Sequence, residues 1–254
     1  METNNGILSQ ENRFSGVSKR YTHVKTEDII KAFTDKGYVI RDVQVSRTRK
    51  KEHEGFQKHL VRLTHPDFTL KTVGDSKPEI LVRNSYDGES SGRLYLGVYR
   101  LVCSNGLIVG KTFDEIRVRH SGDALTKFLE GAEKIRKQAD SLNETIASWS
   151  NIKLTPIQVS RFSFNAWDII APKNAFGPDL GVAFAPSREA DIGLDLWRTY
   201  NRIQERLLNG GIHYQINNDD GEIRNNTTKR VKGVDSIIRI NQKLFDLAVQ
   251  VSHE

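Results

Sequence analysis

Apolar and polar residues alternate through the centre of the chain, between Ile80 and Arg119, in the period-two pattern of consecutive β-strands. Two turn signals divide this stretch. One is DGESSG at Asp87–Gly92, and the other is SNG at Ser104–Gly106, where Asn-Gly supplies the positive backbone angles of a short hairpin. The pattern therefore predicts an antiparallel meander of three or four strands.

Helical periodicity lies on both sides of the meander. Before it, Thr26 is the expected cap of a helix whose apolar face continues to Phe33 and which stops at Gly37. After it, apolar residues recur at steps of three and four from Leu125 to Trp149, which indicates about seven turns of one amphipathic helix. Such a stripe must pack across the sheet, so the expected fold class is α+β: an antiparallel β-meander covered by long helices, with a helical C-terminal region.

A separate strand pair precedes the meander. Val39–Arg47 alternates with period two, and Gly55–Leu63 is its expected partner. The turn between them would be a hairpin tip rich in basic residues. We name four of these residues the basic finger: Arg47, Arg49, Lys50 and Lys51.

The C-terminal part of the chain is less regular. Asn, Pro and Gly are frequent in Thr155–Gly181, which predicts packed loops or short elements. Helices are expected over Ala190–Asn209, ending at Gly210-Gly211, and over Asp235–Val251. Between these two helices lies a second basic cluster, which consists of Arg224, Lys229, Arg230 and Lys232.

These patterns divide the chain into three regions. Residues 1–22 are polar and aperiodic, which is typical of a flexible N-terminal arm. Residues 23–153 are expected to form the α+β sheet domain. Residues 154–254 are expected to form a mixed, mainly helical region packed on the first.

Composition adds a moderate positive charge. The 254 residues include 38 Lys and Arg against 32 Asp and Glu, which gives a net charge of +6 and a pI near 9.3, so the surface favours polyanions. The single cysteine, Cys103, excludes an internal disulfide and fits a reducing compartment. No apolar run approaches the roughly 20 residues that span a bilayer, and the polar start differs from a signal peptide. We expect a cytoplasmic protein that makes no membrane contact.

Signatures of catalysis are weak in this sequence. Cys103 lies within an expected strand, with no helix start beside it to activate the thiol. Zinc-binding motifs and a P-loop are both missing. The acidic turns at Asp87–Glu89 and Asp219–Glu222 lack the ligand spacing of a calcium loop. We expect no enzyme, no cofactor and no metal, and keep as an alternative a metal-dependent nuclease whose carboxylates come from distant segments.

The meander carries the strongest functional pattern. Tyr95 and Tyr99 lie among its arginines, which are Arg83, Arg93, Arg100, Arg117 and Arg119. Guanidinium groups pair with phosphate oxygens and aromatic faces accept stacked bases, so the combination favours a nucleic-acid strand. Alternation puts Arg100 on the opposite face from the tyrosines, so at least one of the set must be structural. A half-buried sheet with a solvated basic face explains the same pattern without a ligand.

Several stretches together carry a family resemblance. They are NSYDGESSGRLYLGVYRLVCSNGL, HSGDALTKFLEGAEKI, LWRTYNRIQERLLNGG and KRVKGVDSIIRINQKLFDLA. With these, most of Thr26–Ala248 resembles the phage and plasmid-type proteins grouped as domain of unknown function 932. The resemblance implies an origin in a mobile element and one architecture running through both halves. It implies no catalytic residue, and it favours a context of replication, recombination or counter-defence.

The order of elements is also similar to that of phage single-strand annealing recombinases. That similarity concerns fold order alone and is an analogy. It implies a basic groove between a sheet and a hairpin that holds single-stranded DNA, and assembly into rings or helices.

Two function hypotheses follow. The first is a non-enzymatic protein that binds or anneals single-stranded DNA as a homo-oligomer, because the expected helices around Trp149 and before Gly210 present more apolar surface than one small sheet can cover. Its contacts would come from the meander arginines and tyrosines, the basic finger and the second basic cluster. The alternative is a phage counter-defence protein in the host cytoplasm that binds and inhibits a host protein.

Overall fold

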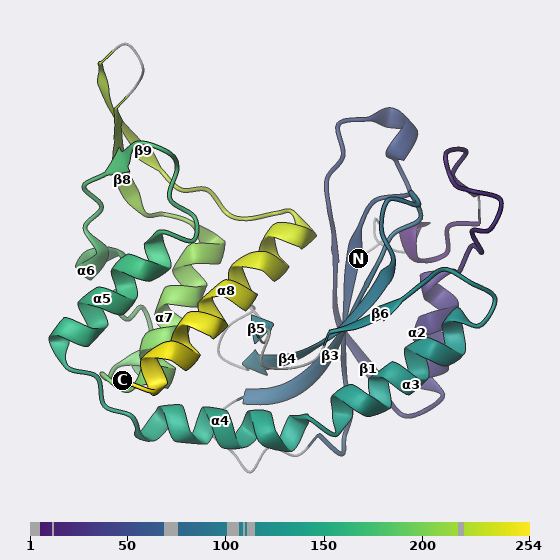
Figure 1. Ribbon diagram of the computed structural model, residues 1–254, viewed down its shortest axis with the longest axis horizontal. Coiled ribbons are helices and arrows are strands. Elements are labelled where there is room, and N and C mark those ends of the chain that lie inside the picture. Colours follow the sequence, from purple (N-terminus) through teal and green to yellow (C-terminus); the bar gives the residue numbers. More distant parts are fainter. Residues whose placement is uncertain are drawn as a thin grey trace. The chain divides into compact units, whose positions relative to one another are not determined.

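The computed structural model describes residues 6–11, 13–68, 76–100, 107–108, 110, 115–217 and 221–254. Three sequence features lie outside this part of the chain: Cys103, the SNG turn and Asp219-Asp220. The chain splits into two compact units. Unit 1 comprises Met1–Leu101, Phe113–Leu142 and Lys232–Val234, and unit 2 comprises Val102–Thr112, Asn143–Val231 and Asp235–Glu254. The fold class is α+β, as the sequence predicted (Figure 1).

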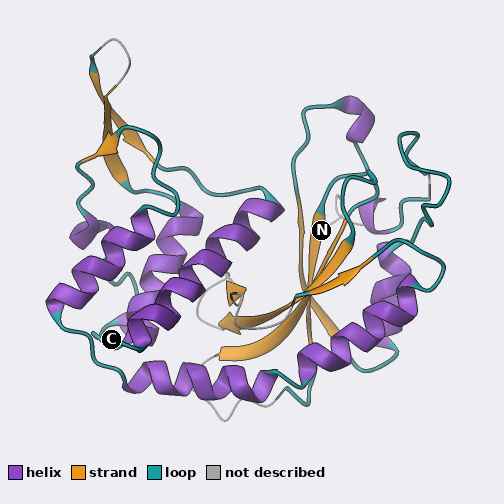
Figure 2. Cartoon of the chain, in the orientation of Figure 1, coloured by secondary structure: helices purple, strands orange, loops and turns teal. Residues whose placement is uncertain are grey.

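Unit 1 is built on an antiparallel sheet. Its strands are β1 (Val39–Val45), β2 (His59–Thr64), β3 (Ser76–Asn84), β4 (Gly92–Arg100) and β6 (Ile116–Val118). They pair in the order β1-β2-β3-β4, and β6 pairs with β4 (Figure 2). The helical elements of this part are α2 (Thr26–Thr34), the short η1 (Lys51–His53) and α3 (Ala124–Arg136). The meander and the hairpin before it are therefore confirmed.

Helix α3 packs closely on one face of this sheet because glycines lie at the contact. A Cβ atom on Gly92 would come within 2.4 Å of the Phe128 ring, and one on Gly131 within 2.7 Å of Leu94 and 2.9 Å of Ile116. The face under α2 and α3 is apolar and buried; its residues include Val61, Leu63, Ile80, Val82, Leu94, Leu96 and Val98. This face is the hydrophobic core of unit 1.

The expected seven-turn helix is two helices. Helix α3 ends at Arg136, and α4 spans Ala139–Asn151. No Gly or Pro lies between them, so the sequence carries no breaker signal. The two ends of the apolar stripe serve different cores: Phe128 packs in unit 1, whereas Trp149 packs in unit 2. Leu125, expected at the start of the stripe, is exposed.

Unit 2 is mainly helical. Its elements are β5 (Leu107–Ile108), most of α4, α5 (Pro156–Trp167), β7 (Ala175–Phe176), α6 (Leu180–Ala183), η2 (Glu189–Asp191), α7 (Leu196–Asn209), β8 (His213–Asn217), β9 (Ile223–Thr227) and all but the first residue of α8 (Val234–Ser252). Strands β7, β8 and β9 form an antiparallel sheet in that order. The final helix is confirmed, whereas the β8–β9 hairpin was not expected.

Aromatic side chains form the core of unit 2. The Trp149 ring lies 4.8 Å from Phe245 and 5.6 Å from Tyr200, and Trp197 stacks on Tyr200 at 5.9 Å. The apolar faces of α4 and α7 thus cover one another within a single chain. They do not need a second copy, so the stated reason for expecting a homo-oligomer is wrong.

Two helices of unit 2, α5 and α7, begin at positions that the sequence patterns did not predict. Segment 155–181, expected to lack long elements, contains α5, whose start has a full capping box between Thr155 and Gln158 with Pro156 in the first turn. The helix expected from Ala190 begins only at Leu196, because Asp195 caps it by accepting a hydrogen bond from the Arg198 backbone N–H at 2.9 Å.

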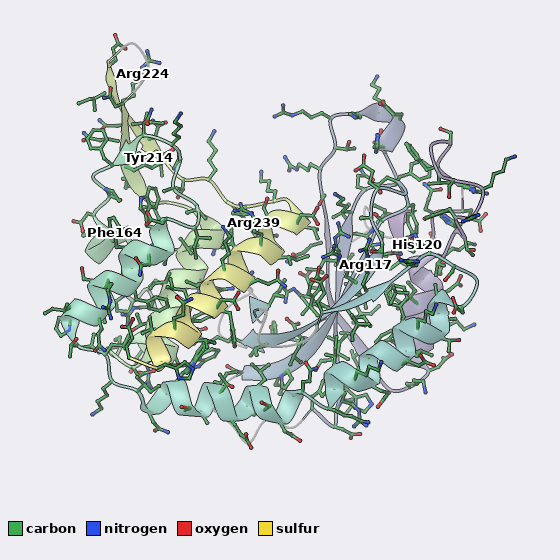
Figure 3. The ribbon with its side chains drawn as sticks, in the orientation of Figure 1. Arg117, His120, Phe164, Tyr214, Arg224 and Arg239 are labelled. Atoms are coloured by element: carbon green, nitrogen blue, oxygen red, sulfur yellow. The ribbon has the colours of Figure 1, made fainter. Side chains whose placement is uncertain are left out.

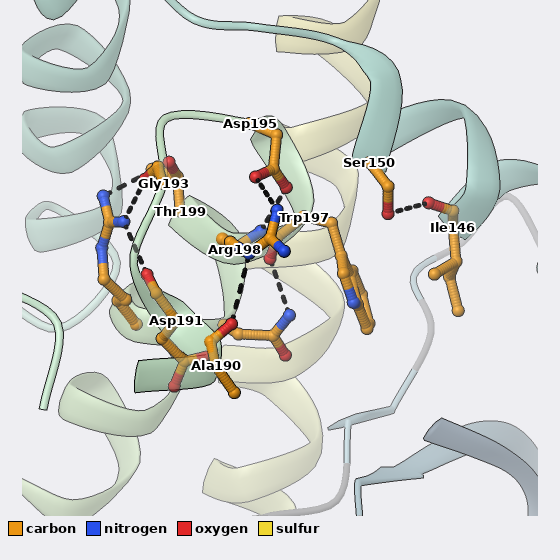
Figure 4. A network of polar contacts seen from close by, with 11 residues as sticks. Ile146, Ser150, Ala190, Asp191, Gly193, Asp195, Trp197, Arg198 and Thr199 are labelled. Carbon is orange, nitrogen blue, oxygen red and sulfur yellow. Dashed lines mark hydrogen bonds and ion pairs between the residues drawn. The ribbon is translucent and has the colours of Figure 1, made fainter. Parts of the chain in front are cut away.

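The residues before α7 form a polar turn instead of a helix (Figure 4). The Arg202 guanidinium donates to the backbone oxygens of Asp191 at 3.1 Å and Gly193 at 2.6 Å. Leu194, which lies in the segment expected to be helical, is exposed. Hydrogen bonds of a buried arginine therefore stabilise this turn.

A buried polar network closes one end of the unit 1 sheet. His59 contacts the Gln57 backbone oxygen with Nδ1 at 2.9 Å and the Thr26 hydroxyl with Nε2 at 2.6 Å. The amide of Asn84 donates to the same hydroxyl at 2.8 Å and meets Nε2 of His120 at 2.8 Å. A carbonyl only accepts, so His59 carries its proton on Nδ1 and His120 carries its proton on Nε2. Burial lowers the pKa of both imidazoles to about 4, which favours their neutral form at pH 7.

Thr26 was expected to cap α2. It is instead the first residue of the helix, and its buried hydroxyl joins the polar network. Part of the expected N-terminal arm is also ordered against unit 1. The Tyr86 hydroxyl donates to the Leu8 backbone oxygen at 3.1 Å, and Nε2 of His23 lies 2.6 Å from the Gln10 backbone oxygen.

The sheet also contains a buried ion pair. Arg62 in β2 contacts Glu79 in β3, and both side chains are buried. Burial raises the pKa of Glu79, and the charge of Arg62 opposes that change.

None of the helices that the structure describes is both long enough and apolar enough to cross a membrane.

Glu79→Gln should destabilise the protein by about 3–5 kcal/mol, because it leaves the buried Arg62 guanidinium without a counter-charge. The matched control is Glu115→Gln, which removes a partly exposed partner of Arg93 and should change stability by no more than about 1 kcal/mol. Urea unfolding followed by circular dichroism measures both values. Equal losses for the two variants would contradict a special role for the buried pair.

Acidification below pH 6.5 should destabilise the fold. Burial lowers the pKa of His59 and of His120 to about 4, against about 6.5 in an unfolded chain. Between these values the unfolded chain binds protons that the folded chain does not, so the free energy of unfolding falls as pH falls through this window. Melting temperatures from pH 4 to 7.5 measure the effect.

The His120→Gln variant keeps a donor for Asn84 and should flatten this pH dependence. His213→Gln, at an exposed histidine of β8, is the control and should leave it unchanged. If the melting temperature of the His120 variant depended on pH as that of the wild type does, His120 would contribute nothing to the pH dependence of stability.

Candidate nucleic-acid interface

Antiparallel register places three of the expected contact residues side by side. Arg83 in β3 is the partner of Arg93 in β4, and Arg93 is the partner of Arg117 in β6. Directly paired residues point to the same face of a sheet, so the three side chains form one row across three strands. The neighbouring Leu94 and Ile116 contact Gly131 of α3, so the row lies on the face away from that helix.

The arginines of this row differ in exposure. Arg83 is buried, and its Nη1 donates to the Ser91 backbone oxygen at 3.2 Å. Arg93 is half-buried and pairs with Glu115. Arg117 is exposed, and its Nε donates to the Ser91 hydroxyl at 2.6 Å (Figure 3). Arg83 is therefore structural, and Arg117 is the member of the row best placed to meet a phosphate.

The tyrosines do not provide the expected stacking surface. Tyr95 is 3% exposed, and burial raises the pKa of its hydroxyl to about 12. A stacked base needs an open ring face, so the expectation for Tyr95 is wrong. Tyr99 is half-buried, and the guanidinium carbon of Arg41 lies 4.1 Å from the centre of its ring. Arg100 is buried, which agrees with the structural role that its parity indicated.

The basic finger lies in the loop between β1 and β2, at residues 46–58. The Ser46 N–H donates to the Lys58 backbone oxygen at 2.8 Å and closes the base of this loop. All four side chains of the finger are exposed, and none forms an ion pair with a described residue. Val45 pairs with His59, and His59 pairs with Asn84, so the loop is at the same end of the sheet as the arginine row.

Arg119 adds another exposed cation at this end. It follows β6 directly and has no ion pair within the described part of the chain. The next residue, His120, is buried, and its backbone oxygen accepts a hydrogen bond from the Thr22 N–H at 3.1 Å. The backbone is thus fixed beside an arginine whose head remains in solvent.

The second basic cluster is divided between the two units. Arg224 is in β9 of unit 2 and pairs with Glu222 at 2.9 Å; both are exposed. Lys229 and Arg230 follow the strand and are exposed. Lys232 belongs to unit 1, where the Val234 N–H two residues on donates to the hydroxyl of Ser46 at 3.1 Å. The fold therefore brings Lys232 near the base of the basic finger.

The β8–β9 ribbon is an exposed surface of unit 2. Every residue of β9 is exposed, and β8 has no buried residue (Figure 3). The Gln215 amide donates to Asn225 at 3.2 Å, while Asn226 pairs with Tyr214 in the register. Amide and guanidinium side chains are those that read base edges in nucleic acids.

Sequence patterns did not predict two groups of polar side chains that the fold of unit 1 brings together. Thr26, His59, Asn84 and His120 are far apart in the chain and form a network only through the tertiary fold. In the β1–β2 and β3–β4 loops, His53, Asp87 and Glu89 form the one group among the described residues whose side chains could hold a metal ion. The Asp87–Glu89 turn was recognised, but its histidine neighbour comes from the β1–β2 loop and leaves no local signal.

Known proteins resemble this chain along most of its length. The family model described as Domain of unknown function (DUF932) matches residues 13–238. The UPF0380 protein YafZ of Escherichia coli K12 is 29% identical over 238 residues, covering 94% of this chain and 85% of its own. The UPF0380 protein YfjQ of the same strain is 31% identical over 246 residues, with the same coverage. No solved structure shows a significant match. The chain belongs to the family described as Domain of unknown function (DUF932), in agreement with its sequence motifs.

Proposed function

We propose that the protein binds nucleic acid, single-stranded DNA in particular, and acts in recombination or replication. The observation that carries this proposal is the basic finger: four exposed cations in one loop without an ion pair to any described residue. Like charges held close together repel one another, and a polyanion relieves that repulsion while it releases its own counterions.

The other arginines of the sheet support this assignment by contrast. Arg62 is paired with Glu79, Arg93 is paired with Glu115, and Arg83 is held by a backbone oxygen. These side chains stabilise the fold. The finger and Arg119 form no ion pair with any residue that the structure describes, so their charge is available to a ligand.

The ribbon of unit 2 provides a further surface for the same class of ligand. Its exposed amides and Arg224 suit contacts to bases or phosphates. The preference for a single strand rests on the similarity in fold order to phage annealing recombinases.

We also propose that copies of the chain associate. The support is apolar surface on unit 2, where Ile157 is 80% exposed and Phe164 is 58% exposed. Val182 and Leu194 are exposed as well, and both Phe164 and Leu194 line a groove beside α5. Surface of this kind in a DNA-binding protein favours assembly along a strand.

Removing two finger charges should weaken binding to single-stranded oligonucleotides without sequence preference, since phosphate contacts carry no base identity. In Lys50→Ser/Lys51→Ser, the slope of log affinity against log salt should flatten by about 1.4, that is 0.7 for each lost contact. Fluorescence anisotropy at several salt concentrations measures it.

The matched control for the finger is Lys134→Ser/Lys137→Ser. It removes two exposed lysines at the far end of α3 and its C-cap and should keep the wild-type slope. If the two double variants showed the same slope of log affinity against log salt, the basic finger would not be part of the interface. Wild-type protein that binds no oligonucleotide at any salt concentration would favour the inhibitor of a host protein instead.

Light scattering at micromolar concentration should give a mass above the 28.9 kDa of one chain. Ile157→Ser/Phe164→Ser should shift the mass towards the monomer, because it removes exposed apolar area. Val39→Ser, at an exposed apolar residue of unit 1, is the control and should leave the mass unchanged. A monomer mass for the wild-type protein, with and without DNA, would contradict the assembly.

A further inference from the structure

Two loops of unit 1 bring an imidazole and two carboxylates together. His53 ends η1 in the β1–β2 loop, while Asp87 and Glu89 lie in the loop between β3 and β4. One potential ligand atom from each side chain lies within 4.8 Å of the others. Asp87 is 8% exposed, His53 is half-buried and Glu89 is exposed, so the group opens to solvent on one side.

The loops hold these side chains in place. The Tyr86 N–H donates to the Phe56 backbone oxygen at 3.2 Å and ties the two loops together. Oδ1 of Asp87 accepts from the Glu89 N–H at 3.1 Å, in a turn that Gly88 permits with a φ of +72°. The backbones of both loops and the Asp87 side chain are thus positioned by contacts that do not involve an ion.

Three polar atoms of Tyr21, His23 and His120 in unit 1 have no hydrogen-bond partner among the described residues. They are the Tyr21 hydroxyl, Nδ1 of His23 and Nδ1 of His120, and all three are buried. The Tyr21 ring lies 5.0 Å from His120 and 6.5 Å from His23, and His23 lies 4.9 Å from Tyr86, which precedes Asp87.

His120 is itself about nine-tenths buried. Buried polar atoms are rarely left without a partner, so water is an expected partner of these three atoms. The charge of Asp87 also contributes to the raised pKa of Tyr21, after burial and the charge of Tyr86, which is consistent with a location beside that carboxylate.

We propose that His53, Asp87 and Glu89 bind a divalent transition-metal ion of the class of Mn²⁺ or Zn²⁺. One imidazole and two carboxylates form a donor set for these ions, whereas Mg²⁺ and Ca²⁺ prefer sites made of oxygen alone. Three protein ligands leave coordination positions for water or for an oxygen of a bound anion. The ion would also add positive charge in the loop that carries the basic finger.

The proposal does not rest on nucleic-acid binding, and titration calorimetry of the full chain with Mn²⁺ or Zn²⁺ alone tests it. We expect one saturable site for each chain. Glu89→Gln changes an exposed side chain and keeps the fold, and His53→Phe keeps the ring that packs 4.9 Å from Phe14. Each should weaken metal affinity by more than about tenfold. Loss of a group that only orients a ligand already costs about that much, and these two residues are direct ligands in the proposal.

Glu52→Gln is the matched control, since it neutralises the exposed carboxylate next to His53 without touching the group. It should bind the ion as the wild type does. No saturable binding to wild-type protein, or the same affinity in Glu89→Gln, His53→Phe and the control, would overturn the proposal. Circular dichroism of each variant shows whether a loss reflects unfolding, and a folded Glu89→Gln variant is sufficient to decide.

Discussion

The antiparallel register of the unit 1 sheet is the constraint on which the rest of that unit depends. Successive side chains of a strand point to opposite faces, so a slip of one residue would exchange the apolar face under α3 with the face that carries the arginine row. Gly92 and Gly131 allow the close approach of α3 that is seen in this register, because a Cβ at either position would clash with Phe128 or Leu94. The packing that buries the core thereby also sets where the cations lie.

The same register explains why one end of the sheet carries so much polar chemistry. His59 pairs with Asn84 across β2 and β3, which lets the two side chains share the Thr26 hydroxyl under the helix. Each hydrogen bond in this buried place is strong because water does not compete, and each donor lost would leave a costly unsatisfied group. The loops that begin beyond this network therefore start from a rigid base, which is the condition for holding ligands in fixed positions.

Sequence patterns predicted the elements whose faces are regular. The meander, α2 and α8 follow from period two and period 3.6 because one face of each is buried. The division between α3 and α4 could not be predicted, since no breaker marks it and one continuous stripe serves two cores. The start of α5 could have been found from its Thr-Pro-x-Gln box. Tyr95 shows a different failure: alternation gives the face of a residue, but only the fold decides whether that face is covered.

For the candidate site, the sequence identified cations but could not separate those that have partners from those that do not. What separates them is whether each charged side chain is buried and whether it forms an ion pair. Arg62 and Glu79 form an ion pair in a buried place of low dielectric. Removal of one partner would leave the other as an unpaired buried charge, so this pair serves the stability of the fold. The charges of Arg47, Arg49, Lys50 and Lys51 remain in water and form no ion pair with a described residue, and their mutual repulsion favours a bound anion. A charge that stabilises the folded chain and a charge that stabilises a complex are therefore distinguished by burial and pairing, which arise from contacts between strands far apart in the sequence.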